Sequence, residues 1–291
     1  MTYGKFKKEL LKRFRERLNG EEVNIVRIKN NGIKGERFQF KDSDENLLWQ
    51  TIHIRDIYDQ HCDGVTMDDC VEFLAGLYQT SPDAEEILSC WDKAKGQIEM
   101  RIVNRRWQQK FLKQVVYQKF LDLAVYCVLV FERNPGGFIG NSVKTWMLER
   151  WGITEEELWD AAWSNLKNQQ FVICNIENVT GISNYELEEL LDLSNLDNEA
   201  YVLTNRYYYN GAVGILRTDL LEEFSKKKEC DFYIIPSSMN EVILMPDTGK
   251  RDPEFLKGLL VKNNANYCNG EELSNHVYYY YKERRKIEMI I

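Results

Sequence analysis

The sequence lacks the glycine-rich loops and cysteine pairs that mark many well-known functional sites. Gly136-Gly137 is its only adjacent glycine pair, and no phosphate-binding loop, dinucleotide fingerprint or nucleophile elbow is present. Seven cysteines are scattered without a Cys-x-x-Cys pair, which excludes a zinc ribbon and a thioredoxin-like motif. The three histidines, at 53, 61 and 276, share no helical or hairpin ligand spacing. We therefore expect no metal site and no cofactor.

Long apolar runs, proline-rich tracts and an excess of positive charge are also missing. The most apolar stretch, Leu121 to Phe131, has about half of the roughly 20 residues that a membrane-spanning helix needs, and residues 1–18 are charged throughout. A net charge of −8 argues against a dedicated nucleic-acid binder, which needs a broad basic face. Because the odd, widely spaced cysteines fit reduced thiols, we expect a soluble cytoplasmic protein without a membrane span.

An N-terminal region is predicted over residues 1–96. Residues 2–18 form an amphipathic pattern, with an apolar residue at every fourth position and a polar face whose seven basic and two acidic residues give +5. This face indicates either a docked helix with a solvated basic side or a contact with a partner, a membrane surface or RNA. Strands are predicted at 23–28, 36–40 and 47–54, and helices after Thr66 and after Ser81-Pro82.

A second region, residues 97–291, alternates short strand and helix patterns. Leu121 to Phe131 predicts a central strand, and Thr154 with Glu157 forms a capping box that opens a helix. A polar, turn-rich excursion is expected near 175–199. Several neighbouring strands are positioned to form hairpins. The fold class is therefore α+β, with a mixed or mainly antiparallel sheet packed with helices, preceded by the N-terminal helix and a small β and helical region.

The strongest functional candidate is the polar turn 236–241 between two apolar strands, 232–235 and 242–245. Ser237 and Ser238 are possible nucleophiles or anion ligands, Glu241 is a possible base, and Asn240 adds a further hydrogen-bonding group. No histidine lies in this segment, and turn serines often bond their own backbone. The turn is thus either a binding or catalytic loop or a rigid hairpin.

Two other segments contain polar or acidic residues that could take part in binding. Thr204 and Asn205 end a strand and could line the same cleft as the serines, or could cap the strand. Asp122 opens an apolar run, where a buried carboxylate needs a partner or a raised pKa, although the edge of the strand would leave it in water. These three residues, with Ser237, Ser238, Asn240 and Glu241, are the candidate ligand-binding set, and no catalytic residue is assigned.

Several of these blocks together resemble a bacterial family of domains of unknown function. The resemblance rests on Leu203-Thr204-Asn205, on Ile235-Pro236-Ser237-Ser238 with Glu241-Val242, and on Leu273-Ser274 with Val277-Tyr278 and Tyr280. It implies no established activity, cofactor or partner. Members of the family often have histidine where this chain has Asn240, so a His–Glu acid–base pair is in doubt here.

The leading functional hypothesis is a non-catalytic binding or regulatory module that recognises a small ligand or a peptide. One alternative is a hydrolase or transferase with Ser237 or Ser238 as nucleophile and Glu241 or the distant His276 as base. A second alternative is a protein-interaction factor that acts through the basic N-terminal helix. The sequence leans away from an enzyme, and it does not determine the ligand, the oligomeric state or the biological process.

Overall fold

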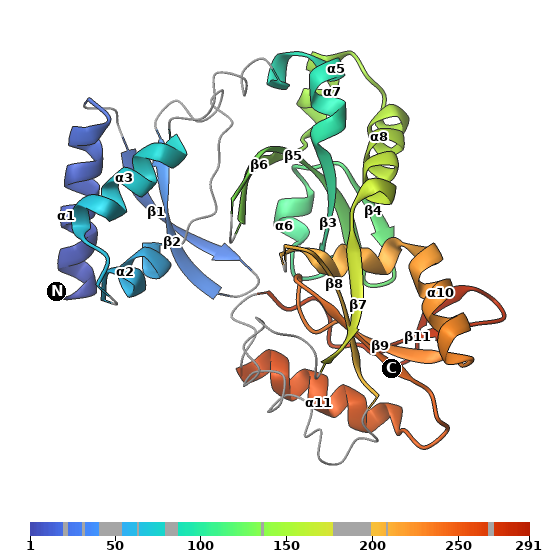
Figure 1. Ribbon diagram of the computed structural model, residues 1–291. Coiled ribbons are helices and arrows are strands. Elements are labelled where there is room, and N and C mark those ends of the chain that lie inside the picture. The colour runs from blue at the N-terminus through green and yellow to red at the C-terminus, as the bar shows by residue number, and fades with distance from the viewer. Residues whose placement is uncertain are drawn as a thin grey trace. The chain divides into compact units, whose positions relative to one another are not determined.

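The structure, a computed structural model, describes residues 1–19, 23–30, 33–40, 54–62, 64–78, 87–134, 137–176, 199–207, 209–266 and 271–291 (Figure 1). These residues belong to two compact units. The first comprises 1–98 with 128–153, and the second comprises 99–127 with 154–291. The domain boundary expected between residues 96 and 97 stays a prediction. The two units are defined by how densely their residues contact one another, and this does not test which segments fold independently.

The first unit begins with helix α1 (Tyr3–Arg17), the hairpin β1 (Val23–Asn30) and β2 (Ile33–Phe40), and helices α2 (Ile54–Cys62) and α3 (Met67–Tyr78). The apolar stripe of α1 is buried in one core with α2 and α3; its central members are Phe6, Leu10 and Phe14. The periodicity therefore predicted this helix correctly. The strand expected at 47–54 is wrong at its end, because Ile54 starts α2; residues 47–53 lie outside the described part.

The remainder of the first unit combines short helical elements with strand residues. It contains α5 (Trp91–Ala94), the 3₁₀ turn η1 (Lys95–Gln97), strand β6 (Gly137–Ser142) and helix α7 (Thr145–Trp151). Gly152 ends α7 with φ of +68°, a conformation that glycine adopts without steric cost. The indole of Trp151 donates to the Leu88 carbonyl at 2.8 Å, which ties α7 to the segment before α5.

A small sheet contains strands β3 (Ile98–Asn104), β4 (Tyr117–Phe120) and β5 (Leu123–Asn134), in the order β3-β5-β4, and β6 also pairs with β5. The short helix α6 (Gln109–Leu112) lies between β3 and β4 in the chain. The apolar run predicted as a central strand becomes β5, which starts two residues later than expected. Phe120 pairs with Leu123, so Leu121 and Asp122 form a two-residue turn.

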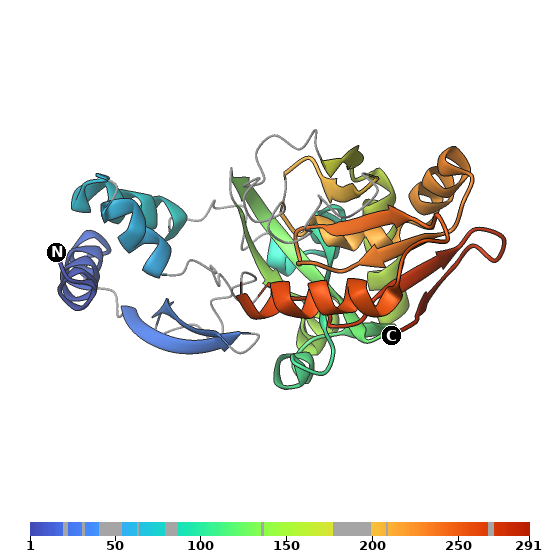
Figure 2. The same cartoon turned by 90° about the horizontal axis from the view of Figure 1, so that it is seen from below.

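The second unit is built on a six-stranded sheet of order β12-β11-β9-β10-β8-β7. Its strands are β7 (Phe171–Asn175), β8 (Tyr201–Asn205), β9 (Phe232–Ile235), β10 (Val242–Pro246), β11 (Tyr278–Tyr281) and β12 (Lys286–Met289). Every neighbouring pair in it is antiparallel. Besides the short α6, the helical elements described in this unit include α8 (Glu155–Asn168), η4 (Gly211–Leu216), α10 (Thr218–Lys228) and α11 (Pro253–Asn266) (Figure 2).

Both faces of this sheet are covered, because side chains alternate between them along each strand. One face packs Val202, Tyr233 and Ile243 against Leu256 and Leu260 of α11. On the other face Phe232 stacks on Tyr280 and meets Phe224 of α10 edge-to-face. Two-sided burial explains why β9 and β10 appear in the sequence as continuous apolar runs.

The strand directions place the candidate residues at one end of the six-stranded sheet. The turn 236–241 joins the end of β9 to the start of β10. Because β8 and β11 run antiparallel to β10 and β9, the end of β8 and the start of β11 lie at that same end. Thr204 and Asn205 therefore lie beside the turn, and so does the segment 271–277 that leads into β11. The excursion expected near 175–199 lies almost entirely outside the described residues.

The α+β class with antiparallel sheets is confirmed by these elements. Within the residues that the structure describes, no helix is both long enough and apolar enough to cross a membrane.

Candidate functional site

The turn 236–241 is closed by hydrogen bonds among its own side chains. The hydroxyls of Ser237 and Ser238 both donate to Oε1 of Glu241, at 3.0 and 2.6 Å. The Ser238 Oγ also accepts from the Asn240 N–H at 3.0 Å. The two serines are only 2% and 8% exposed. A buried hydroxyl that is bonded in this way is fixed in orientation, so the serines stabilise the turn.

Asn240 joins the turn to two other segments. Its Oδ1 accepts from the Asn210 N–H at 3.0 Å, and its Nδ2 donates to Oε2 of Glu271 at 2.8 Å. The Met239 N–H donates to the Glu271 carbonyl at 2.8 Å. One amide thus connects the β9–β10 turn, the loop after β8 and the segment before β11. A neutral imidazole also offers one donor and one acceptor, so histidine here could make the same two bonds.

Thr204 and Asn205 complete this network from the end of β8. The Thr204 hydroxyl donates to the Asn240 carbonyl at 2.8 Å. The Asn205 side chain accepts from the Tyr207 N–H at 2.9 Å and donates to the Tyr209 carbonyl at 2.8 Å. Asn205 therefore holds the loop that follows its own strand. The structure brings six of the seven sequence-predicted residues together, in what we call the turn network: Thr204, Asn205, Ser237, Ser238, Asn240 and Glu241.

Gly211 is in contact with the turn network at a point where no side chain fits. A Cβ at this position would lie 2.3 Å from Thr204 Oγ1, 2.5 Å from the Asn205 nitrogen and 2.6 Å from the Asn240 oxygen. Two of these three atoms belong to the backbone and cannot rotate away. Close packing therefore requires glycine at this position.

Met239 of the turn contacts an apolar cluster, and a buried cation interacts with Tyr209 in the loop after β8. Met239 packs against an apolar cluster of Val103, Leu112, Val115 and Ala124. Arg101 of β3 is 2% exposed, and burial lowers the pKa of its guanidinium. Burial raises the pKa of Tyr209, and the nearby Arg101 charge acts in the opposite direction. Tyr209, whose carbonyl accepts from Asn205, is therefore near the buried charge of Arg101.

Asp122 does not join the turn network but forms a second group, which we call the Asp122 cluster. Its Oδ1 accepts from the Tyr278 hydroxyl at 2.5 Å, and its Oδ2 accepts from the Ser274 hydroxyl at 2.7 Å. The same Oδ2 lies 3.1 Å from Nδ1 of His276. The sequence drew attention to Asp122 and separately to the block from Leu273 to Tyr280. Only the fold brings these two segments together.

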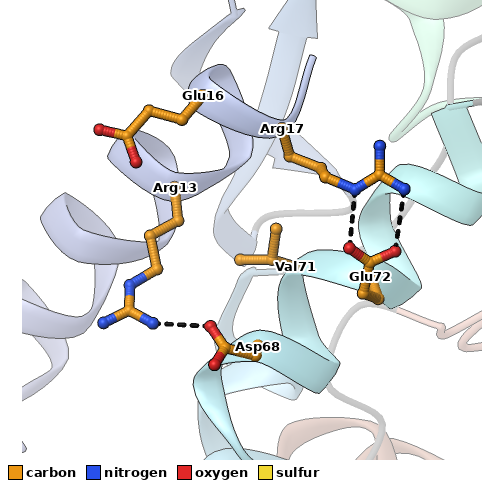
Figure 3. A pocket seen from close by; sticks show the side chains of 6 residues that line it. All are labelled: Arg13, Glu16, Arg17, Asp68, Val71 and Glu72. Carbon is orange, nitrogen blue, oxygen red and sulfur yellow. Dashed lines mark hydrogen bonds and ion pairs between the residues drawn. The ribbon is translucent and has the colours of Figure 1, made fainter. Parts of the chain in front are cut away.

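The basic face of α1 is largely paired within the first unit. Lys7 bonds Glu36 at 2.6 Å, Arg13 bonds Asp68 at 2.7 Å and Arg17 bonds Glu72 at 2.7 and 3.0 Å. Figure 3 shows Arg13 and Arg17 reaching toward α3. Both arginines line an open hollow of about 420 Å³. The bond from Arg17 lowers the pKa of Glu72. These contacts favour a docked helix over a basic surface reserved for a partner.

Among the described residues, no group of three or more His, Cys, Asp or Glu side chains could hold a metal ion. The residues that the sequence did not single out are Arg101 and Glu271, and Ser274 and Tyr278 were noted only as part of the family resemblance. Their types are unremarkable, and they gain importance only through neighbours that are distant in the chain.

Comparison with known proteins places this chain in one family. A family model described as "Family of unknown function (DUF5688)" matches residues 3–282, nearly the whole chain. Searches of curated proteins and of solved structures found no match.

Proposed function

The chain belongs to the family of unknown function DUF5688, and we propose that it is a non-catalytic binding or regulatory module that recognises a small ligand or a peptide. The observation that carries the proposal is that the polar candidate residues form hydrogen bonds within the protein, chiefly with one another. Ser237 and Ser238 share one carboxylate oxygen of Glu241, and Asn240 uses both ends of its amide internally. Such a network gives rigidity rather than a reactive group.

The segment that this network holds in place is the loop after β8. The Asn205 side chain fixes this loop by hydrogen bonds to the Tyr207 N–H and the Tyr209 carbonyl. The loop exposes Arg206 and Tyr207, the latter 42% exposed. The Arg206 guanidinium lies 4.6 Å from the centre of the Tyr207 ring and also bonds its hydroxyl. We therefore place the recognition surface on Arg206 and Tyr207.

Tyrosine and arginine are the residue types most often found at the energetic centre of an interface. An aromatic face offers stacking, and a guanidinium offers paired hydrogen bonds to a carboxylate or phosphate. A loop that is already ordered loses little further entropy on binding. These properties suit a ligand that has a flat group beside an anionic group.

A thermal-shift screen of metabolites, nucleotides and acidic peptides tests the proposal. We expect a hit whose Kd rises at least tenfold in Tyr207→Ala, while the matched control Tyr117→Ala, at a tyrosine 36% exposed on β4, leaves Kd unchanged. Asn205→Ala should weaken binding and lower the melting temperature together. The proposal fails if no compound raises the melting temperature, or if binding is indifferent to both Arg206→Ala and Tyr207→Ala.

A serine-dependent hydrolase or transferase is the second candidate, and one distance favours it. Ser238 Oγ lies 2.6 Å from the Glu241 carboxylate, within the reach of a base. A fluorophosphonate probe that labels the wild type and Ser164→Ala, but not Ser238→Ala, would support this function. Absence of labelling, or labelling that survives in both Ser237→Ala and Ser238→Ala, would eliminate it. Ser164 is an exposed serine of α8.

The setting of this activity is also a proposal. The six cysteines that the structure describes are free thiols, which is typical of a reducing compartment and supports action in a bacterial cytoplasm. The third candidate, a protein-interaction factor that uses the N-terminal helix, retains less support because Arg13 and Arg17 are paired with Asp68 and Glu72. Deletion of residues 1–18 without loss of binding partners would count against it.

A further inference from the structure

A stretch of the second unit is strongly basic, although the chain as a whole is acidic. Residues 100–121 contain six arginines and lysines and no acidic residue, so this stretch carries +6 in a chain whose net charge is −8. Arg101 is buried and Arg105 is half-buried, and four of the six are exposed: Arg106, Lys110, Lys113 and Lys119. The negative net charge therefore conceals a local region of positive charge.

These four exposed cations differ from the basic residues of α1 in their surroundings. On α1, the side chains of Lys7, Arg13 and Arg17 each pair with a carboxylate of the first unit. Within the part of the chain that the structure describes, none of the four forms an ion pair with a carboxylate. Their charge is thus available to an anion from outside, and neighbouring cations together raise the local concentration of such anions.

Three of the four cations lie on one face of a short helical segment that contains α6. The Asn104 Oδ1 accepts from the N–H groups of Arg106 and Trp107, each at 3.0 Å, and so opens this segment. Arg106, Lys110 and Lys113 follow the spacing i, i+4 and i+7, which places them on the same helical face. Trp107 precedes Lys110 by three residues, so its ring, 41% exposed, neighbours this face.

Strand β4 adds the fourth cation on the same side of the small sheet. Lys119 pairs with Ala124 of β5, and directly opposed residues of antiparallel strands point to the same face. Ala124 belongs to one buried apolar cluster with Leu112 of α6 and Val115 just after it. Lys119 therefore projects from the face on which the helical segment packs. We call the resulting surface the basic patch; it consists of Arg106, Trp107, Lys110, Lys113 and Lys119.

The composition of the basic patch favours single-stranded nucleic acid over other anionic partners. Lysine and arginine neutralise phosphates, and an exposed indole stacks on a base that is not paired in a duplex. Lipid binding needs apolar side chains on the outer face, whereas Leu112 and Val115 of this segment are only 4% and 6% exposed. An acidic peptide would pair with the cations but would leave the Trp107 ring without a stacking partner.

We propose that the basic patch binds a single strand of RNA or DNA, with its four cations on phosphates and the Trp107 ring stacked on a base. This function is separate from the recognition surface on Arg206 and Tyr207 and goes beyond it. Each phosphate contact on a single strand contributes about −0.7 to the slope of log K against log salt, so four contacts predict a slope of about −3. The affinity should then fall about 50-fold between 50 and 200 mM salt.

Fluorescence anisotropy of the full chain with labelled dT and U strands of about 12 nucleotides tests the proposal. We expect Trp107→Ala to raise Kd at least about fivefold without changing the salt slope, while Trp107→Phe, which keeps a ring, stays within about twofold. Lys110→Gln combined with Lys113→Gln should reduce the salt slope to about half. The charge-matched control, Lys227→Gln with Lys262→Gln at exposed lysines of α10 and α11, should keep the wild-type Kd and slope.

A second comparison uses the wild-type chain and does not depend on the folding of a variant. An abasic strand has the same phosphates without the bases, so we expect it to bind at least about fivefold more weakly than dT with the same salt slope. Poly-glutamate and anionic phosphatidylserine vesicles, added at equal charge, should not displace the labelled strand. A tighter complex with U than with dT assigns RNA as the ligand, and the reverse assigns DNA.

The proposal is overturned if neither strand binds, if the abasic strand binds as tightly as dT, or if poly-glutamate or vesicles displace the strand. It is also overturned if the Lys110→Gln and Lys113→Gln chain keeps the wild-type slope. Tyr207→Ala should leave strand binding unchanged, and loss of binding in this variant would place the strand on the other surface. Failure at the basic patch leaves the function proposed for Arg206 and Tyr207 untouched, because the thermal-shift screen measures that surface separately.

Discussion

Gly211→Ala is the substitution that tests the turn network most directly. The new methyl group would be built 2.3 Å from Thr204 Oγ1, 2.5 Å from the Asn205 nitrogen and 2.6 Å from the Asn240 oxygen, all well inside van der Waals contact. Relief requires the end of β8 and the 236–241 turn to separate. That movement would break the 2.8 Å hydrogen bond from Thr204 to the Asn240 carbonyl.

The expected loss of stability follows from two contributions. Overpacking of a close-packed site costs about 1–3 kcal/mol, and loss of a buried hydrogen bond adds about 0.5–1.5 kcal/mol. Together they predict that the free energy of unfolding falls by about 2–4 kcal/mol. At about 2–4 °C for each kcal/mol, the melting temperature should fall by roughly 5–15 °C.

Urea denaturation followed by tryptophan fluorescence measures this loss, with Gly258→Ala as the control. Gly258 lies on α11 with nothing within 4 Å of an added Cβ, so alanine there should raise stability by about 1 kcal/mol. The double variant Thr204→Ala with Gly211→Ala should remain destabilised, because the two backbone contacts persist. Stability within about 0.5 kcal/mol of wild type in Gly211→Ala, or recovery in the double variant, would refute the reasoning.

Three further predictions concern other parts of the chain. In urea denaturation, the free energy of unfolding of Asn240→His should stay within about 1 kcal/mol of wild type, because an imidazole can replace both hydrogen bonds of the amide. Asn240→Leu should lower it by about 2–3 kcal/mol, because it leaves the Asn210 N–H and the Glu271 carboxylate without this partner. Thr154→Ala removes the α8 capping box and should cost about 1 kcal/mol in the same assay. Burial raises the pKa of Tyr126 to about 12, so the neutral phenol stabilises the fold below its ordinary pKa of about 10 and this contribution is lost as pH rises toward 12. The stability of Tyr126→Phe should therefore fall less than that of wild type between pH 10 and 12, and equal slopes of melting temperature against pH would contradict this.

The sequence predicted secondary structure correctly where interactions between residues close in the chain determine it. Thr154 and Glu157 form the predicted capping box, with the Glu157 N–H 3.2 Å from the threonine hydroxyl, and the stripe of Phe6, Leu10 and Phe14 is buried as its spacing required. Where local signals were weak the predictions shifted. The strand predicted from Leu121 begins at Leu123 as β5, and β6 was not predicted because glycine and asparagine interrupt its pattern.

The sequence predicted which residues belong to the turn network, but it did not predict how they bond to one another. The sequence placed Ser237, Ser238 and Glu241 in one short turn, since turn residues between apolar strands are locally recognisable. It suggested that Thr204 and Asn205 line the same cleft, and the antiparallel pairing of β8 with β10 brings them beside the turn. It left open whether the serines bond within their own turn, and it did not predict that Glu241 and Asn240 would be their partners.

The amino-acid sequence by itself determined the α+β class, the amphipathic N-terminal helix and the position of the polar turn, because each depends on periodicity, capping and turn chemistry within a few residues. Only the tertiary structure decided that Asp122 meets His276, 154 residues along the chain, and that Gly211 must remain without a side chain. Those contacts depend on strand order and register. Strand order is set by packing over the whole second unit, and no local pattern encodes it.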